Sequence, residues 1–450
     1  MDLLRILQAI RELRGHERWT RPQLMAYQSK ALQQLRENAY ARSPFYQRFH
    51  RGLYDRPLQD LPVLTKSMMM ENFDELVTDR SVRLDKVRAF SEDRTEDRLF
   101  LDRYWVTATS GSSSQPGFFL FNQQEWSTIV ASFGRGQEWS GAKVSLFHRR
   151  KMATVASTSP WHTSSQVART AKSWWTTSIR LPSTDSLESI VQELNHWQPG
   201  ILIAYASMAR ILANEQLDGR LRIQPTKVFT SSEVLTDETR RLIKSIWGDE
   251  PFNQYGATET ADIAAEYQTC RHMHLFEDLV IAEVVDENYQ PVPQGTYGAK
   301  LLITTLFSRT QPLIRYELND SVRLSMESCA SGLPFAILES IQGRIEDILY
   351  VPAKSGGRVA IQSLVFNRIM DILPVGGWQV TQNSDDTLTV FISGTHDEIN
   401  DRELENTLRQ ALTEQGALVP AINVQRISTI PKTSSGKTPL IKGHKSLRMQ

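Results

Sequence analysis

The chain has 450 residues, 40% of them hydrophobic and 23% charged, and its 51 basic and 51 acidic residues give a formal net charge of zero. This length exceeds what one hydrophobic core usually supports, and the neutral balance excludes a general electrostatic attraction to nucleic acid or anionic membranes. Two cysteines are too few for a disulfide framework, so we expect a globular protein of a reducing compartment, the cytoplasm.

The N-terminal part of the chain predicts a helical leader. Residues 1–95 carry apolar positions three and four apart among many charged residues, which is typical of amphipathic helices. This stretch lacks the uninterrupted apolar core of a signal peptide. No window elsewhere approaches the length of a membrane span. We therefore expect no membrane partner.

The remaining pattern predicts a large and a small domain. Up to about residue 340, short apolar runs alternate with helical segments such as 187–197 and 237–247, which predicts sheets covered by helices with a parallel component. Strand-like and helical pieces then alternate for about a hundred residues. We therefore predict an α/β fold with a large multi-layer α/β N-terminal domain, 1–342, and a small α+β C-terminal domain, 343–450.

Two motifs in the predicted large domain carry residues suited to nucleotide chemistry. The hydroxyl-rich turn at 107–119 could direct N–H groups towards a phosphate, although most such stretches are surface loops. In the segment NQYGATETAD, Tyr255 could stack on a base, Thr258 could reach a phosphate and Glu259 could hold Mg²⁺. The ordinary alternative for this segment is a capped turn between a strand and a helix.

Three further motifs follow. Asp320 ends a strand-like segment and could accept hydrogen bonds from a ribose diol, with a surface ion pair as the ordinary alternative. The segment QGRIEDIL joins Arg344 to acidic residues at the predicted domain boundary. The segment PKTSSGKTPL presents Lys437 on a loop whose composition alone indicates a linker.

Taken together, these motifs resemble those of the adenylate-forming superfamily of acyl-CoA synthetases, synthetase adenylation domains and luciferases. They follow one another in that family's order, and the resemblance extends from about residue 40 to 440. The chain is most similar to the phenylacetate-CoA ligase branch. Segments such as LPVLTKSMMMENFDEL and CRHMHLFED also resemble deazaflavin-coenzyme adenylyltransferases and indoleacetate-lysine ligases. The resemblance implies that the C-terminal domain is a mobile lid.

The resemblance also implies a role for each motif residue. Catalysis falls to Thr258, Glu259 and Lys437, with Mg²⁺ on Glu259 and Lys437 on the lid. The residues that the resemblance places around ATP are Thr109, Ser110, Gly111, Ser112, Ser113, Ser232, Glu233, Tyr255, Gly256, Asp320 and Arg344.

The sequence departs from the family pattern in two motifs. Ser114 and Gly117 stand where the phosphate loop usually has a second glycine and often a lysine, which could loosen phosphate binding. Glu346 stands at the hinge, where the family commonly has Asp or Lys.

The phenylacetate-CoA ligase branch often carries a structural zinc ion, and this chain keeps part of its ligand set. Cys270, His274 and Cys329 occupy matching positions, but Ser331 replaces the last cysteine, with His272 as a candidate replacement ligand. Structural zinc needs four good N or S ligands, so both a retained ion and cysteines that serve only packing stay open.

By family position, the acyl substrate lies against four residues, which are Trp161, His162, Tyr205 and Ala206. Aromatic walls would favour a flat or apolar acid, although a structural role is the ordinary alternative for such residues. We expect an AMP-forming acid–thiol ligase that uses ATP and Mg²⁺ and passes the acyl group to CoA or to the phosphopantetheine of an acyl carrier protein. The alternatives are an amide-forming ligase and a non-catalytic nucleotide- or acyl-binding module. A homodimer is compatible with each.

Overall fold

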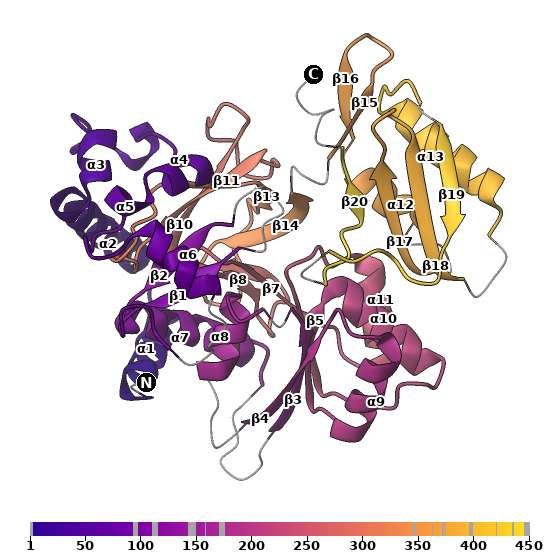
Figure 1. Ribbon diagram of the computed structural model, residues 1–450, viewed down its shortest axis with the longest axis horizontal. Coiled ribbons are helices and arrows are strands. Elements are labelled where there is room, and N and C mark those ends of the chain that lie inside the picture. Colours follow the sequence, from indigo (N-terminus) through magenta and orange to yellow (C-terminus); the bar gives the residue numbers. More distant parts are fainter. Residues whose placement is uncertain are drawn as a thin grey trace. The chain divides into compact units, whose positions relative to one another are not determined.

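The computed structural model describes residues 3–92, 98–109, 116–142, 150–157, 159–170, 176–344, 348–361, 363–370, 373, 375–395, 399–419, 421–433 and 436–444 (Figure 1). The chain forms two compact units, each built from segments that are distant in sequence. The first unit comprises 1–145, 158–174 and 253–340, and the second comprises 146–157, 175–252 and 341–450.

The first unit begins with the predicted helical leader and continues with two more helices. The helices of this unit are α1 (Leu3–His16), α2 (Arg21–Arg42), α3 (Pro44–Phe49), α4 (Lys66–Glu71), α5 (Phe73–Leu76), α6 (Leu84–Glu92), α7 (Gln123–Trp139) and α8 (Thr163–Thr170), with a 3-10 turn at Leu58–Asp60. Local sequence fixes several of their ends. Thr20 and Gln23 form a capping box at the start of α2, where Pro22 also suits the first turn.

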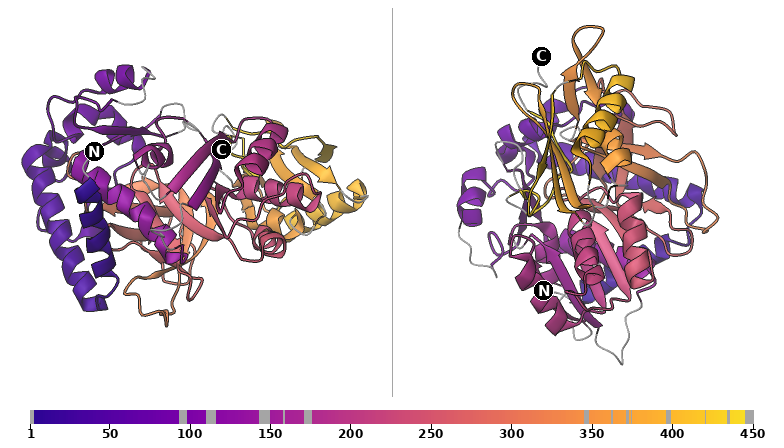
Figure 2. Two further views of the ribbon diagram at one scale, coloured as in Figure 1. Left: turned by 90° about the horizontal axis from the view of Figure 1, so that it is seen from below. Right: turned by 90° about the vertical axis from the view of Figure 1, so that its right-hand side faces the viewer.

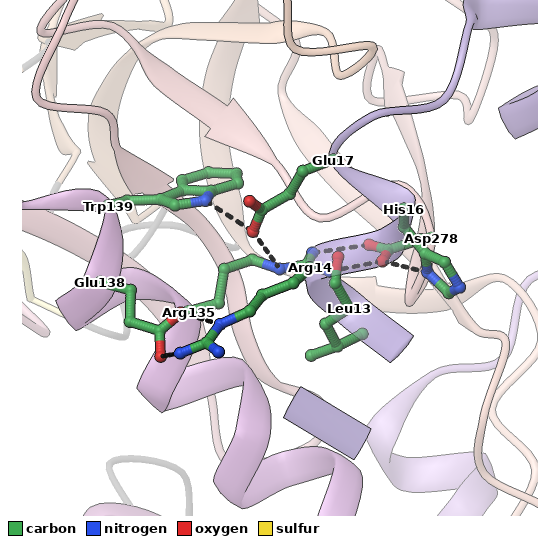
Figure 3. Close-up of polar contacts among 8 residues, drawn as sticks. All are labelled: Leu13, Arg14, His16, Glu17, Arg135, Glu138, Trp139 and Asp278. Atoms are coloured by element: carbon green, nitrogen blue, oxygen red, sulfur yellow. Dashed lines mark hydrogen bonds and ion pairs between the residues drawn. The ribbon is translucent and has the colours of Figure 1, made fainter. Parts of the chain in front are cut away.

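A buried ion network ties α1 to α7 (Figure 3). Arg135 on α7 donates two hydrogen bonds to Asp278, from Nη1 to Oδ1 at 2.8 Å and from Nη2 to Oδ2 at 2.6 Å. His16 at the end of α1 lies 2.8 Å from the same carboxylate, and Arg135 also donates to the carbonyl of Leu13. The N-terminal helix is therefore held by charge as well as by apolar packing.

Three groups of strands complete the first unit. A hairpin pairs β1 (Trp105–Ala108) with β2 (Phe118–Phe121), and a second sheet has the order β10 (Val280–Val285), β11 (Lys300–Thr305), β12 (Tyr316–Leu318). The third group has the order β13 (Asp320–Leu324), β14 (Ile337–Arg344), β9 (Met273–Leu275), β8 (Ala261–Glu266), β7 (Phe252–Ala257). Helix α7 packs on β8.

The second unit contains the parallel strands that the sequence predicts. Their order is β6 (Lys227–Ser231), β5 (Ile201–Tyr205), β3 (Arg150–Ala156), β4 (Thr176–Pro182). The crossover helices are α9 (Leu187–Trp197), α10 (Ala206–Leu217) and α11 (Asp237–Trp247). Helix α11 begins at an N-cap, Thr236, and ends at Gly248 in the left-handed conformation. Leu202, Leu212 and Ile243 belong to one buried core shared by the strands and helices.

The C-terminal segment of the second unit is a small α+β assembly (Figure 2). Its four-stranded sheet has the order β19 (Ile422–Arg426), β18 (Leu388–Thr395), β17 (Val375–Gln382), β20 (Ile441–Lys442). A hairpin of β15 (Leu349–Pro352) and β16 (Arg358–Ile361) precedes it. Helices α12 (Ser363–Met370) and α13 (Asp401–Glu414) share a buried core with the sheet, which includes Phe366, Trp378 and Leu408.

The architecture confirms the predicted α/β fold with a small α+β C-terminal part. Residues from Ile341 onward share a unit with the parallel strands, and the domain boundary near residue 343 stays a prediction. Among the described residues, none of the helices has the length and hydropathy needed to cross a membrane.

Candidate active site

The Tyr-Gly-Ala-Thr-Glu motif forms the turn between β7 and β8. The pairing register shifts at Tyr255 and Gly256, which marks a bulge. A Cβ added to Gly256 would lie 2.8 Å from the carbonyl oxygen of Ala261, too close for any real side chain. Glycine is therefore required for the close approach of these two strands, and the turn's shape follows from it.

The structure brings together two residues that the sequence assigned to different parts of ATP. The hydroxyl of Tyr255 donates to Asp320 Oδ2 at 2.6 Å, and both side chains are buried. Asp320 begins β13, the strand that follows β12. Tyr255 therefore orients the carboxylate that the sequence predicts as the ribose contact, and a ribose diol bound here would share it with the tyrosine.

Glu259 is the buried acid of the turn, with 8% of its surface exposed. The hydroxyl of Tyr316 lies 3.5 Å from Glu259 Oε1, and burial together with this carboxylate raises the pKa of Tyr316 well above its ordinary value. A carboxylate oxygen is the ligand type that Mg²⁺ prefers. The carbonyl of Thr258 accepts from the hydroxyls of Thr107 and Thr163, at 3.4 and 3.5 Å, which ties the turn to β1 and α8.

The described ends of the hydroxyl-rich loop close on each other. The N–H of Thr109 donates to the carbonyl of Gly117 at 3.0 Å, and the N–H of Gly117 donates to Thr109 Oγ1 at 2.8 Å. Lys66 Nζ donates to Thr109 Oγ1 at 3.3 Å. Residues 110–115 lie outside the described part, including the predicted Ser110, Gly111, Ser112 and Ser113 and the departure at Ser114.

Lys66 is a residue that the motif analysis missed. It opens α4 after the N-cap Thr65 and lies 43 positions before Thr109. The predicted phosphate loop lacks the lysine of the family pattern, and the structure places the ammonium group of Lys66 beside Thr109, the last described residue before that loop. The segment LPVLTKSMMMENFDEL contained this lysine, but no local spacing linked it to the loop.

In the second unit, the Ser232–Glu233 segment leaves β6 through a strained turn. Ser232 has φ of 68°, a left-handed conformation that is unusual for a residue with a side chain. Glu233 Oε2 accepts the N–H of Ser207 in the first turn of α10 at 2.9 Å, and its Oε1 accepts the N–H of Thr438 at 2.8 Å. Desolvation raises the pKa of Glu233, while the hydrogen bonds and the charge of Lys437 oppose the rise.

The Ser-Gly-Lys loop presents Lys437 towards Tyr205. Its ammonium lies 5.6 Å from the centre of the Tyr205 ring. The loop turns back on itself, because the N–H of Lys437 donates to Thr433 Oγ1 and the N–H of Thr433 donates to the carbonyl of Lys437. Gly436 has φ of 76°, and a Cβ at this position would lie 2.0 Å from Ser183 Oγ. Gly436 therefore allows the loop to contact Ser183 closely, and this contact fixes the position of the following residue, Lys437.

The predicted acyl-pocket residues fall into two groups. Trp161 contacts the ring of Phe90 edge-on at 5.6 Å, and its carbonyl accepts the N–H of Ala108, while His162 lies just before α8. In the second unit, the Tyr205 hydroxyl accepts the N–H of Ser157 at 2.9 Å, and Ala206 begins α10. Tyr205 thus also contacts Lys437, which its sequence context did not indicate.

Cysteines and histidines gather in the first unit. Ligand atoms of Cys270, His272 and Cys329 all lie within 4.8 Å of one another. His274 Nε2 lies 3.4 Å from Cys270 Sγ, and its Nδ1 lies 3.1 Å from the carbonyl of Phe335. Burial acts to raise the pKa of Cys329, but hydrogen bonds with Ser331, His272 and Cys270 outweigh it and lower this pKa to about 7. His272, the candidate replacement ligand, thus lies within ligand distance of the two cysteines.

The predicted hinge lies outside what the structure describes in detail. Arg344 ends β14, but its side chain lies outside the described part, and so does Glu346. The ribose contact and the hinge role of these residues stay predictions.

Comparisons with known proteins agree with this geometry. No family model matches the chain. It is 27% identical over 173 residues to phenylacetate-coenzyme A ligase of Thermus thermophilus, across 36% of this chain and 38% of that protein. It is 22% identical over 393 residues to protein CapK of Staphylococcus aureus, across 84% of this chain and 79% of that protein. A crystal structure of 2-hydroxyisobutyryl-CoA ligase matches with a TM-score of 0.72 at 16% identity, covering 96% of this chain and 92% of that one.

The chain thus shares the fold of a solved acyl-CoA ligase over nearly its whole length. Its sequence is similar to a phenylacetate-coenzyme A ligase over about a third of each chain.

Proposed function

We propose that this protein activates a carboxylic acid with ATP to an acyl-adenylate and then passes the acyl group to the thiol of CoA. The observation that carries the proposal is the seating of Lys437 beside Tyr205, with the following residue, Thr438, hydrogen-bonded to Glu233. A lysine held on a folded-back loop is preorganised to stabilise charge on a reacting phosphate. The similarity to phenylacetate-coenzyme A ligase and to 2-hydroxyisobutyryl-CoA ligase supports the same activity.

The first step joins the acid to AMP. An oxygen of the substrate carboxylate attacks the α-phosphorus of ATP, and the bond from this phosphorus to the bridging oxygen breaks, which releases pyrophosphate. Lys437 offsets the negative charge that gathers on the α-phosphate oxygens, while Tyr255 and Asp320 hold the adenosine end. In the second step, the thiolate of CoA attacks the acyl carbon, and AMP leaves with the bonding electrons.

Glu259 fits the proposed magnesium site. Its carboxylate is buried in the turn after β7 and supplies the oxygen ligand that Mg²⁺ prefers. Bound there with the phosphates of ATP, Mg²⁺ would neutralise part of their charge. Thr258 directly precedes this acid in the turn, and we propose that its hydroxyl contacts the same phosphates.

Lys66 supplies the cation at the base of the phosphate loop. We expect Lys66→Met to raise the Kd for ATP about tenfold, because a charge-assisted hydrogen bond to phosphate is lost. Titration calorimetry with ATP and Mg²⁺ measures the change. Lys86→Met, on the exposed face of α6, is the matched control and should leave the Kd unchanged. An unaltered Kd in Lys66→Met would remove Lys66 from the phosphate site.

The activity is tested by pyrophosphate release from ATP and Mg²⁺ across aryl, arylacetic and medium-chain acids, with and without CoA. We expect release that depends on one acid class, stimulation by CoA, and a product with the mass of the thioester. We expect the enzyme to prefer aromatic or apolar acids because the rings of Trp161 and Phe90 contact each other at the predicted acyl pocket. A product formed only with an amine would favour the amide-forming alternative. A product formed only with a carrier protein would identify the phosphopantetheine thiol of that carrier as the acceptor. ATP binding without release from any acid would refute the proposed activity.

The cluster of Cys270, His272 and Cys329 offers three ligand atoms suited to a structural zinc ion. We propose His274 as the fourth ligand, because its Nε2 lies 3.4 Å from Cys270 Sγ and the carbonyl of Phe335, 3.1 Å from its Nδ1, orients the ring. We expect about one zinc per chain in protein purified without chelator.

Cys270→Ser should lower the zinc content and the melting temperature, whereas His196→Gln, an exposed histidine on α9, should change neither. Elemental analysis and thermal unfolding measure both. Wild-type protein without zinc, and unaffected by chelator, would assign the cysteines to packing.

A further inference from the structure

Glu233 connects two parts of the second unit that lie far apart in sequence. One carboxylate oxygen accepts the N–H of Ser207 in the first turn of α10, and the other accepts the N–H of Thr438 on the Ser-Gly-Lys loop. The two distances, 2.9 and 2.8 Å, are those of good charge-assisted hydrogen bonds. Each oxygen of the side chain thus accepts a hydrogen bond within the protein, and the predicted place of Glu233 beside the nucleotide stays a prediction.

The rest of the loop docks beside this carboxylate. Lys432 Nζ donates to the carbonyl of Ser183 at 2.6 Å, and Gly436 lies against the side chain of the same serine. Arg210 on α10 donates to the carbonyl of Val375 at 3.0 Å, a direct contact between α10 and the C-terminal segment. The bond to Glu233 is made by Thr438, the residue that directly follows Lys437.

We propose that Glu233 is a positioning residue that latches the lysine loop for the first half-reaction and releases it for the second. The inference rests on the proposed function. Consecutive Cα atoms lie 3.8 Å apart, so fixing the N–H of Thr438 also restricts where the Lys437 side chain starts. The Tyr205 ring lies 5.6 Å from the ammonium and also restricts it. In the proposed mechanism the second half-reaction takes place at the acyl carbon and not at the α-phosphorus, so we infer that the latch has no part in that step.

The proposal predicts unequal effects on the two half-reactions. In Glu233→Gln the amide keeps the shape, but its NH₂ group faces an N–H donor where an acceptor oxygen stood. We expect acid-dependent pyrophosphate release to fall about 10- to 100-fold, the range for loss of a charge-assisted hydrogen bond. Thioester formation from synthetic acyl-adenylate and CoA should stay within about threefold of the wild type, and the Kd for ATP should not change.

Thr438→Pro provides an independent variant, because proline removes the N–H that Glu233 accepts. It should reproduce the selective loss of the first half-reaction. Glu238→Gln, which exchanges a glutamate paired with Arg241 on α11, is the matched control and should leave both half-reactions unchanged. Equal loss of both half-reactions in Glu233→Gln, or a raised Kd for ATP that accounts for the loss, would overturn the latch.

A second measurement tests the latch without any substrate. Trypsin cleavage after Lys437, followed by mass spectrometry of the C-terminal peptide, reports how long the loop stays docked. We expect cleavage in Glu233→Gln to be about tenfold faster than in Glu238→Gln. Equal rates would overturn the latch even in a protein with normal adenylation. Wild-type protein that releases no pyrophosphate would instead refute the proposed function, and the cleavage rates would still decide the latch.

Discussion

Lys437→Ala is expected to lower acid-dependent pyrophosphate release by about 100-fold or more, with a change of less than about threefold in the Kd for ATP. The ammonium acts on charge that develops during attack on the α-phosphorus, so its loss destabilises the transition state more than bound ATP. The loop that carries it is ordered by its own hydrogen bonds to Thr433, and alanine leaves those backbone contacts in place. The variant should therefore fold and bind nucleotide.

Single-turnover pyrophosphate release and titration calorimetry separate these two effects. Lys354→Ala, an exposed lysine in the turn between β15 and β16, is the matched control and should behave as the wild type. Asp320→Ala, on the nucleotide side, should instead weaken ATP binding because the ribose acid is lost. Equal losses of affinity and of turnover in Lys437→Ala would mean that this lysine binds ATP and does not act on the reacting phosphate.

The hydrophobic periodicity of the sequence predicted amphipathic helices, which pack through one face. It did not predict which elements contact one another. Helices α9 and α11 span the same residues as the predicted segments, 187–197 and 237–247, because each has a clear apolar stripe and polar caps. Spacing along the chain carries no information about which distant residues meet. The bond between Tyr255 and Asp320 joins positions 65 apart, and the motif order named both residues without relating them.

The same limit explains what the sequence missed at the candidate site. Lys66 lies on a helix of the leader, where a lysine is an ordinary surface residue, and only the fold places it at Thr109. Glu233 was assigned to the nucleotide because its motif resembles the family segment beside the adenine, and nothing in the sequence indicated its bond to Thr438, which spans 205 positions. Cys270 and Cys329 were named through the family resemblance and His272 as a candidate replacement, and the fold brings their ligand atoms within 4.8 Å of one another.

The buried network around Asp278 should dominate the stability of the first unit (Figure 3). The Asp278 side chain is fully buried, and that of Arg135 is 2% exposed. The Arg135 guanidinium also lies over the rings of Trp139, Phe276 and Phe335. A buried cation in these surroundings has little access to water, so its carboxylate partner is difficult to replace.

We expect Asp278→Asn to lower the free energy of unfolding of this unit by about 3 kcal/mol, because the amide preserves volume but leaves Arg135 with Glu17, at 3.6 Å, as its remaining acidic partner. Glu138→Gln removes an exposed partner of Arg14 on the same two helices and should cost less than about 1 kcal/mol. Denaturant unfolding followed by tryptophan fluorescence at pH 7 measures both changes. Similar losses in the two variants would show that the buried pair adds nothing beyond a surface ion pair.

The pH dependence gives this prediction a second test. Burial opposes the charged form of Asp278, but Arg135 and His16 outweigh it and lower the pKa of this carboxyl from its ordinary 3.8 to about 2. Because the folded pKa lies below the unfolded value, the contribution is fully present above pH 3.8 and is lost as the pH falls towards 2. The difference in stability between wild type and Asp278→Asn should therefore stay constant from pH 7 down to about 4 and narrow below it. A difference that already narrowed between pH 7 and 5 would mean that another group, and not this carboxylate, balances the charge of Arg135.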